Sequence, residues 1–387
     1  IVFACFLARG FIKTGLGRRI AYGFISFFGG TPYGMSYGLT FSSLCMAPLI
    51  PSSTARTGGV ILPVLESIIQ VLTGKKEKSH IDAHKAAQVS SFLTMVVFHA
   101  SVITSAMFLT ANAGNPIAVK FAQNVGIDIS WMAWAKAAIV PGLISLVLLP
   151  IFLRKFFTCE VEDAEKIRQH AKTELHSMGK MTLSEKILIG VFGMLLVLWS
   201  CGGMLSVHPT EAALFGVGIL LIAKVLTWND LLKEDMAWDT FIWMAVLVMM
   251  ASELQSQGVI TWFTNYIVKI VPAIDWPLQV LLLGLIYYYS HYFFASITAH
   301  VSSMYGPFLV VCLVSGAPAL WTALFLAFLS SLFGGLTHYS SGPAPILYSQ
   351  GHVDVKTWWK IGIISSVFYL VIWIVAGGLW WKLLGLV

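Results

Sequence analysis

Two short polar stretches with the same residue pattern lie between apolar segments of the sequence. The first is SSTAR at 52–56 and the second is SITAH at 296–300, an offset of 244 residues. Hydroxyl groups can donate hydrogen bonds to carboxylate oxygens, and the basic residues Arg56 and His300 add positive charge beside them. The pattern therefore predicts two anion-binding turns, one in each half of the chain.

The first turn sits in the longer stretch PSSTARTGG, residues 51–59. Gly58 and Gly59 let the backbone turn sharply and leave amides exposed, and helix N-termini favour anions. A buried arginine at the centre of a membrane costs about 2.5–3.5 kcal/mol on insertion scales, so we expect Arg56 to have an anionic partner. Two such turns with basic residues suit a substrate that carries a carboxylate at each end.

Two further polar stretches, LTANAGNP at 109–116 and LTHYSSGP at 336–343, also share a pattern, because each proline follows its leucine by seven residues. They are predicted to interrupt helices and to face the two turns. The predicted substrate-binding residues are Ser52, Ser53, Thr54, Arg56, Thr57, Asn112, Ser296, Thr298, His300, Thr337, His338, Ser341 and Pro343.

Each of these assignments has a structural alternative. Arg56 could be paired with a backbone carbonyl or with Glu66, and His300 could be a satisfied core histidine. Asn112 and His338 could contact the substrate or merely complete the hydrogen bonds of the broken helices. The residue types alone leave these alternatives open.

The amino-acid composition indicates the environment of these turns. Of 387 residues, 57% are hydrophobic and only 11% are charged, whereas a soluble domain has about 25% charged residues. The chain is predicted to be an all-α polytopic membrane protein in the plasma membrane. Five scattered cysteines without a CxxC pair suggest neither a disulfide framework nor a zinc site.

Several classes of function find no support in the motifs. The sequence contains no HExxH motif, no evident nucleophile–base pair and no GxxxxGK[ST] loop, which argues against an intramembrane enzyme and an ATP-driven pump. No cofactor, metal ion or nucleic-acid partner is expected. An anion channel stays open as an alternative to a carrier.

The elements around the turns are too short to cross a bilayer singly. A helix from Met35 to Ile50 would be about 24 Å long against an apolar core of about 30 Å. Two short arms joined by a polar tip predict a re-entrant hairpin, which is tolerated only where the tip is buried in protein or lines a watery cavity. The distribution of basic residues predicts that the first hairpin enters from the cytoplasm.

The repeated patterns predict an internal duplication. Five crossings are expected between the two turns, and an odd number makes the repeat inverted, an architecture of transporters. The first repeat is predicted at 1–180, with a hairpin at 34–72 and a broken helix at 91–125. The second is predicted at 181–387, with a hairpin at 278–315 and a broken helix at 319–350. Mapping the second copy onto the first predicts that N-terminal helices, at least about 60 residues, precede Ile1.

Three stretches resemble the divalent anion/sodium symporter (DASS) family: PSSTARTGG, HYFFASITAHVSSMYGP and GGLTHYSSGPAPILYSQG. The similarity is greatest to its exchanger branch, the bacterial citrate/succinate and tartrate/succinate antiporters and the plastid-type 2-oxoglutarate/malate translocators. The resemblance implies a homodimer in a lipid bilayer, with a scaffold domain and a transport domain that moves like an elevator.

One departure from the family pattern bears on ion coupling. The family's turns carry Ser-Asn-Thr, which binds carboxylate and helps to build sodium sites in symporters, whereas the middle residues here are Ser53 and Ile297. Ile297 offers no side-chain oxygen to a hard cation, and Arg56 and His300 put positive charge nearby. The resemblance with this departure implies an antiporter that exchanges dicarboxylates (malate, succinate, fumarate, 2-oxoglutarate) independently of sodium. The alternative is a sodium-coupled dicarboxylate symporter.

Overall fold

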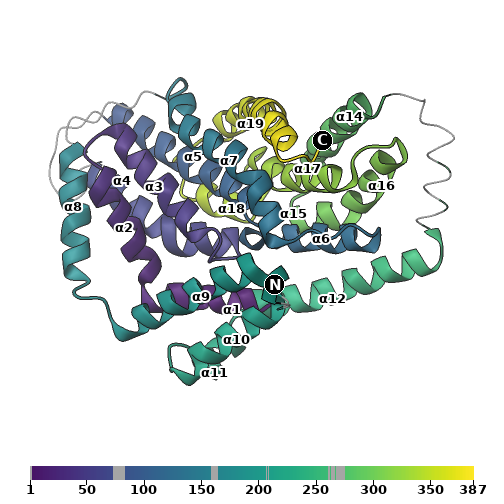
Figure 1. Ribbon diagram of the computed structural model, residues 1–387. Helices are drawn as coiled ribbons and strands as arrows, with labels where there is room; N and C mark the ends of the chain where they lie inside the picture. Colours follow the sequence, from purple (N-terminus) through teal and green to yellow (C-terminus); the bar gives the residue numbers. More distant parts are fainter. Residues whose placement is uncertain are drawn as a thin grey trace.

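The computed structural model describes residues 2–72, 83–157, 164–205, 207, 209–259, 262, 266 and 275–387. Within these ranges the chain is helical and contains no β-strand (Figure 1). Six helical stretches of the described residues are long and apolar enough to cross a membrane. Together with the high apolar content, they confirm the expectation of an all-helical, multi-pass membrane protein.

The elements of the first half surround the first polar turn and the first helix break. They are α1 (Val2–Thr14), α2 (Leu16–Phe28), α3 (Pro32–Met46), η1 (Ala55–Ile61), α4 (Leu62–Leu72), α5 (Ala83–Met107), η2 (Leu109–Ala111), α6 (Gly114–Asn124), α7 (Trp131–Leu153) and α8 (Ala164–Ser177).

The second half contains the second turn and the second break. Its elements are α9 (Leu183–Leu205), α10 (Pro209–Ile222), α11 (Trp228–Leu232), α12 (Asp235–Ser256), α14 (Trp276–Tyr289), η3 (Ser290–Phe293), α15 (Ile297–His300), η4 (Val301–Tyr305), α16 (Gly306–Val314), α17 (Ala319–Leu332), η5 (Phe333–Gly335), α18 (Pro343–Tyr348) and α19 (Val355–Leu383).

Each polar turn is followed by a π-helical segment, η1 in the first half and η4 in the second. Each segment ends two residues before a proline, Pro63 or Pro307. A proline donates no backbone hydrogen bond and its ring crowds the carbonyl four residues earlier, and a wider helical turn relieves this crowding. The shared sequence pattern thus produces the same local backbone twice.

Two polar stretches, LTANAGNP and LTHYSSGP, lie where helices end and others begin. The first lies between α5 and α6, where Phe108 and Asn112 adopt extended backbone on either side of η2. The second lies between α17 and α18, where η5 leads into an irregular segment at 336–342. Helices α5 and α17 pack against each other, so the two breaks lie side by side in the interior.

A second group of helices, α1, α9 and α10, packs together in the lower part of the view in Figure 1. Lys13 on α1 donates to Asp230 at 2.6 Å, which ties α1 to α11. Partial burial raises the pKa of Asp230, but hydrogen bonds from Lys13 and from Thr227 outweigh it and bring the pKa to about 2. Arg19 on α2 pairs with Glu185 at the start of α9, also at 2.6 Å.

Helix α8 carries charged residues of both signs, and residues 158–163 before it lie outside the described ranges. It lies along α2 and α4. Arg168 Nε donates to the Ser26 carbonyl, and His170 Nε2 lies 2.7 Å from Ser67 Oγ.

Candidate functional site

The first turn is organised by its own hydroxyl groups. Ser52 Oγ accepts the backbone N–H of Ala55 at 3.1 Å, and Thr57 donates to Ser101 Oγ on α5 at 2.8 Å. Thr57 is therefore buried against α5, whereas Ser53 and Thr54 at the tip are half-buried. Of the predicted residues in this turn, Ser53 and Thr54 are partly exposed, and substrate contact by their hydroxyl groups stays a prediction.

Arg56 is fully buried and its guanidinium binds neutral oxygens. One terminal nitrogen donates to the carbonyls of Ile50 at 3.0 Å and Ala111 at 3.2 Å. The other donates to the Ser105 hydroxyl at 3.0 Å, and to the Ser101 carbonyl and the Thr104 hydroxyl at 3.4 Å each. Arg56 thereby joins the first turn, the first break and α5.

No acidic side chain of the described part of the chain pairs with Arg56. Glu66, the alternative partner, instead accepts from His352 Nε2 at 2.7 Å. The Nε of Arg56 has no partner among the described residues. The hydrogen bonds match the carbonyl-paired alternative, and substrate contact by Arg56 stays a prediction.

The second turn inserts an apolar side chain between the two breaks. Ser296 Oγ accepts the Ala299 N–H at 3.4 Å and so caps the start of α15, and it lies 2.8 Å from Thr298 Oγ1. Between them, Ile297 fills narrow spaces beside Gly114 and Gly334, where an added Cβ would lie 2.9 Å from its side-chain carbons. Ile297 therefore has a packing role that joins the turn to both breaks.

The first turn meets the second break in a similarly close approach. A Cβ added to Gly342 would lie 2.0 Å from Thr54 Oγ1. The loop that carries the predicted residues Thr337, Ser341 and Pro343 thus passes directly over the tip of the first turn. Ser340 Oγ accepts the Thr337 N–H at 3.2 Å and so fixes the shape of this loop.

His300 and His338 lie in different environments. His300 is fully buried between the rings of Phe294 and Phe333, with centroid distances of 4.4 and 4.6 Å, and contacts His291. His338 is half-buried and accepts from Trp359 Nε1 at 3.3 Å while its ring packs on Tyr348. The burial of His300 among aromatic rings is that of a core histidine, and substrate contact by either histidine stays a prediction.

Two of the predicted residues hold polar atoms without a partner. The amide nitrogen of Asn112 and the hydroxyl of Ser341 are buried and unpaired within the described ranges. Asn112 Oδ1 accepts the Gly114 N–H at 3.2 Å, so only its Nδ2 is free to donate. Because buried polar groups normally have a partner, these atoms are suited to a ligand oxygen.

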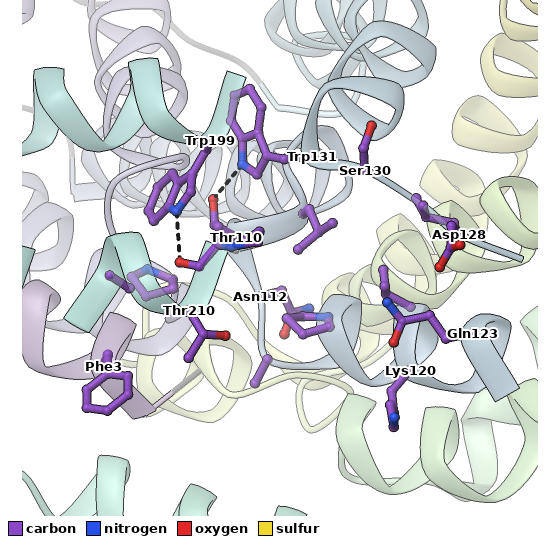
Figure 2. Close-up of a pocket in the computed structure, with 18 of the residues that line it drawn as sticks. Phe3, Thr110, Asn112, Lys120, Gln123, Asp128, Ser130, Trp131, Trp199 and Thr210 are labelled. Atoms are coloured by element: carbon purple, nitrogen blue, oxygen red, sulfur yellow. Dashed lines mark hydrogen bonds between the residues drawn. The ribbon is translucent and has the colours of Figure 1, made fainter. Parts of the chain in front are cut away.

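Asn112 lines a cavity of about 600 Å³ between the first break and the helices α1, α9 and α10 (Figure 2). On its walls Trp131 Nε1 donates to Thr110 Oγ1 at 3.3 Å, and Trp199 Nε1 donates to the Pro209 carbonyl at 3.2 Å. Lys120 and Asp128 supply the charged groups of the lining. The size and the mixture of apolar walls with a few polar groups are typical of a small-molecule site.

Sequence reasoning missed a polar connection between the two breaks. Asn115 Nδ2 donates to the carbonyls of Ser105 and Phe108 at the end of α5, and Asn115 Oδ1 accepts from Ser331 Oγ at 2.9 Å. The location of Asn115 in LTANAGNP marked it as polar within an apolar region. Its partner on α17 follows only from the packing of the two broken helices.

Comparisons with known proteins agree over the whole chain. The sequence model of the family described as the sodium:sulfate symporter transmembrane region matches residues 1–387. The chain is 45% identical to the putative malate transporter YflS of Bacillus subtilis (strain 168), over 100% of this chain and 80% of that protein. It is 43% identical to dicarboxylate transporter 1, chloroplastic, of Spinacia oleracea, over 100% and 68% of the two chains. Inner membrane protein YbhI of Escherichia coli (strain K12) is 34% identical, over 99% and 80%.

Proposed function

The chain belongs to the sodium:sulfate symporter transmembrane family, whose members are transporters and not enzymes, and from this premise we propose that it exchanges dicarboxylates across a membrane. The relatives named for malate and dicarboxylate transport support this substrate class. The observation that carries the proposal is the convergence of both polar turns and both helix breaks. Thr54 meets Gly342, and Ile297 lies between Gly114 and Gly334.

Exchange without sodium is the favoured mode, and Ile297 is the reason. An aliphatic side chain packed between two glycines presents no oxygen to a cation, whereas hard cations require oxygen ligands. Exchange of one dianion for another moves no net charge and needs no coupling cation. Sodium-coupled symport is the alternative that the first experiment must test.

We further propose that the chain is an inverted repeat whose hairpins enter from opposite faces of the plasma membrane. The π-helical segments that follow both turns and end two residues before a proline support a duplication. Movement of the breaks and turns against α1, α9 and α10 would open the cavity at Asn112 to either side, as in an elevator. In a homodimer, contacts between the two subunits would keep in place the helices that do not move.

The decisive experiment uses proteoliposomes that contain the full-length protein. Uptake of labelled succinate is expected to require internal malate and to be the same in sodium and in choline buffers. Uptake into empty vesicles that follows a sodium gradient would establish the symporter instead. Uptake that is insensitive to internal dicarboxylate and to sodium would indicate a channel.

Replacement of Asn112 separates a substrate contact from a structural role. Asn112→Asp retains the oxygen that accepts the Gly114 N–H, but it replaces the unpaired amide with negative charge beside the cavity. We expect KM for succinate to rise by about tenfold or more, because an unpaired like charge opposes a dianion. The melting temperature of Asn112→Asp in detergent should stay near that of the wild type.

The matched control is Gln123→Glu, which adds the same charge at a different part of the cavity lining. It should alter KM less than Asn112→Asp does. Equal effects of the two variants would mean that general charge repulsion, and not contact with Asn112, governs the change.

A further inference from the structure

A chain of four contacts runs through the buried space behind the second turn. Ser290 Oγ lies 2.9 Å from the Tyr287 carbonyl and 3.1 Å from His300 Nε2. His300 Nδ1 lies 2.9 Å from His291 Nδ1, and His291 Nε2 lies 2.7 Å from the Ser340 carbonyl. Both ends of the chain are backbone carbonyl oxygens, which can only accept hydrogen bonds.

The number of hydrogens available does not match the number of contacts. A serine hydroxyl and two neutral imidazoles supply one hydrogen each, so three hydrogens serve four contacts. One added proton completes the chain: His300 donates to both Ser290 and His291, Ser290 donates to Tyr287, and His291 donates to Ser340. We propose that the His291–His300 pair is a proton-binding site that takes one proton from water when a dicarboxylate binds, an inference that rests on the proposed function.

The surroundings of the pair can accommodate a positive charge. Phe294 and Phe333 stack on the His300 ring with interplanar angles of 4° and 20°, and Phe333 also stacks on His291 at 3.9 Å. A cation over an aromatic face within about 6 Å of the ring centre is attracted by the ring. The pair is thus held between groups that favour its protonated form without neutralising it.

No carboxylate pairs with either histidine in the part of the chain that the structure describes. Among the described residues, the hydrogen-bond partners of the two histidines are Ser290, the other histidine and the Ser340 carbonyl, and no other titratable side chain. Tyr287 on α14 contacts Ser330 at 2.7 Å, Tyr305 on η4 donates to the Ala323 carbonyl, and Lys120 on α6 lines the cavity. Helix α17 carries no titratable side chain.

A bound dianion would supply the missing counter-charge. A buried charge without a partner is costly, so the pair is expected to remain neutral in the empty carrier. His300 belongs to the turn that carries Ser296 and Thr298, and Ser340 precedes the unpaired hydroxyl of Ser341. If a carboxylate binds there, it favours the proton, and by linkage the proton favours the carboxylate to the same degree.

His99 provides a comparison within the same protein. It is also fully buried, and its ring nitrogens contact the hydroxyls of Tyr369 and Ser365. Hydroxyl groups can donate as well as accept, so a neutral His99 satisfies both contacts without an added proton. Burial alone therefore does not produce the mismatch found at His291 and His300.

The test is calorimetric titration of succinate into the purified full-length protein, at a pH where succinate is fully ionised. The titration is run in phosphate and in Tris, which differ in ionisation enthalpy. The difference in heat reports the protons taken up, and we expect about one per bound succinate in the wild type. His291→Gln should reduce the number to near zero, and His99→Gln should leave it unchanged.

The affinity provides a second readout that does not depend on the variants. Because binding takes up a proton, KM of the wild type for succinate should increase as the pH rises. Succinate binding with the same heat in both buffers and a KM independent of pH would overturn the proton site and leave the exchanger intact. Absence of succinate binding and exchange would overturn the proposed function and this inference together.

Discussion

An Arg56→Ala variant is expected to exchange succinate about 100-fold or more slowly than the wild type and to have a lower melting temperature. The guanidinium of Arg56 holds the carbonyls of Ile50 and Ala111, which belong to the first turn and the first break. Its removal leaves buried carbonyls unpaired, and a misplacement of about 1 Å in a binding site can cost about 100-fold in rate. Succinate exchange in proteoliposomes and melting in detergent measure the two effects.

Arg56→Lys separates charge from geometry. Lysine keeps the positive charge but lacks the planar fork that reaches several acceptors at once. If Arg56 acts by joining the turn to the break, Arg56→Lys should be nearly as inactive as Arg56→Ala. Substantial activity in Arg56→Lys would instead point to charge acting on the substrate.

Arg168→Ala is the matched control, because Arg168 donates to one carbonyl from the surface helix α8. It should retain exchange and melt close to the wild type. Normal exchange by Arg56→Ala would contradict both the structural and the substrate role of this residue.

The turns and breaks could be predicted from the sequence because a membrane protein rarely places polar groups in apolar segments without a purpose. The repeated pattern around Arg56 and His300 identified both turns, and the prolines at 116 and 343 marked the segments that follow both breaks. These are local features, and the local backbone follows from them.

Partners that come from distant elements could not be predicted in the same way. The carbonyls that bind Arg56 lie up to 55 residues away along the chain, and every carbonyl looks alike in a sequence. Nothing in the sequence around His291 indicates that His300 lies within hydrogen-bond distance of it. Asn115 and Ser331 are 216 residues apart and meet only because α5 packs on α17.

The glycines show how local and distant information combine. Gly342 was part of the stretch GGLTHYSSGPAPILYSQG that carried the family resemblance. The reason for a glycine at this position is the close approach of Thr54 Oγ1, and this approach follows only from the packing of the first turn against the second break. Ile297, in contrast, departs from the family pattern. Its packing against Gly114 and Gly334 accounts for its apolar side chain.

Gly362→Ala is expected to displace the second break and to abolish exchange. Gly362 lies on α19, and a Cβ there would lie 2.0 Å from the Leu336 carbonyl oxygen and 2.8 Å from its carbon. Both are backbone atoms, so the clash cannot be relieved by a side-chain rotation. Either α19 or the loop that begins at Leu336 must move by roughly 1 Å, and such overpacking costs about 1–3 kcal/mol of stability.

Gly378→Ala on the same helix controls for the change of residue type. A Cβ at Gly378 meets no atom within 4 Å, and alanine is the better helix former by about 1 kcal/mol. Gly378→Ala should therefore exchange succinate at the wild-type rate and melt at the same temperature or slightly higher. If Gly362→Ala behaved like Gly378→Ala in both measurements, the contact between α19 and Leu336 would not be needed to position the second break. Loss of exchange in Gly362→Ala alone would show that this contact holds the loop of Thr337 and Ser341 in its working position.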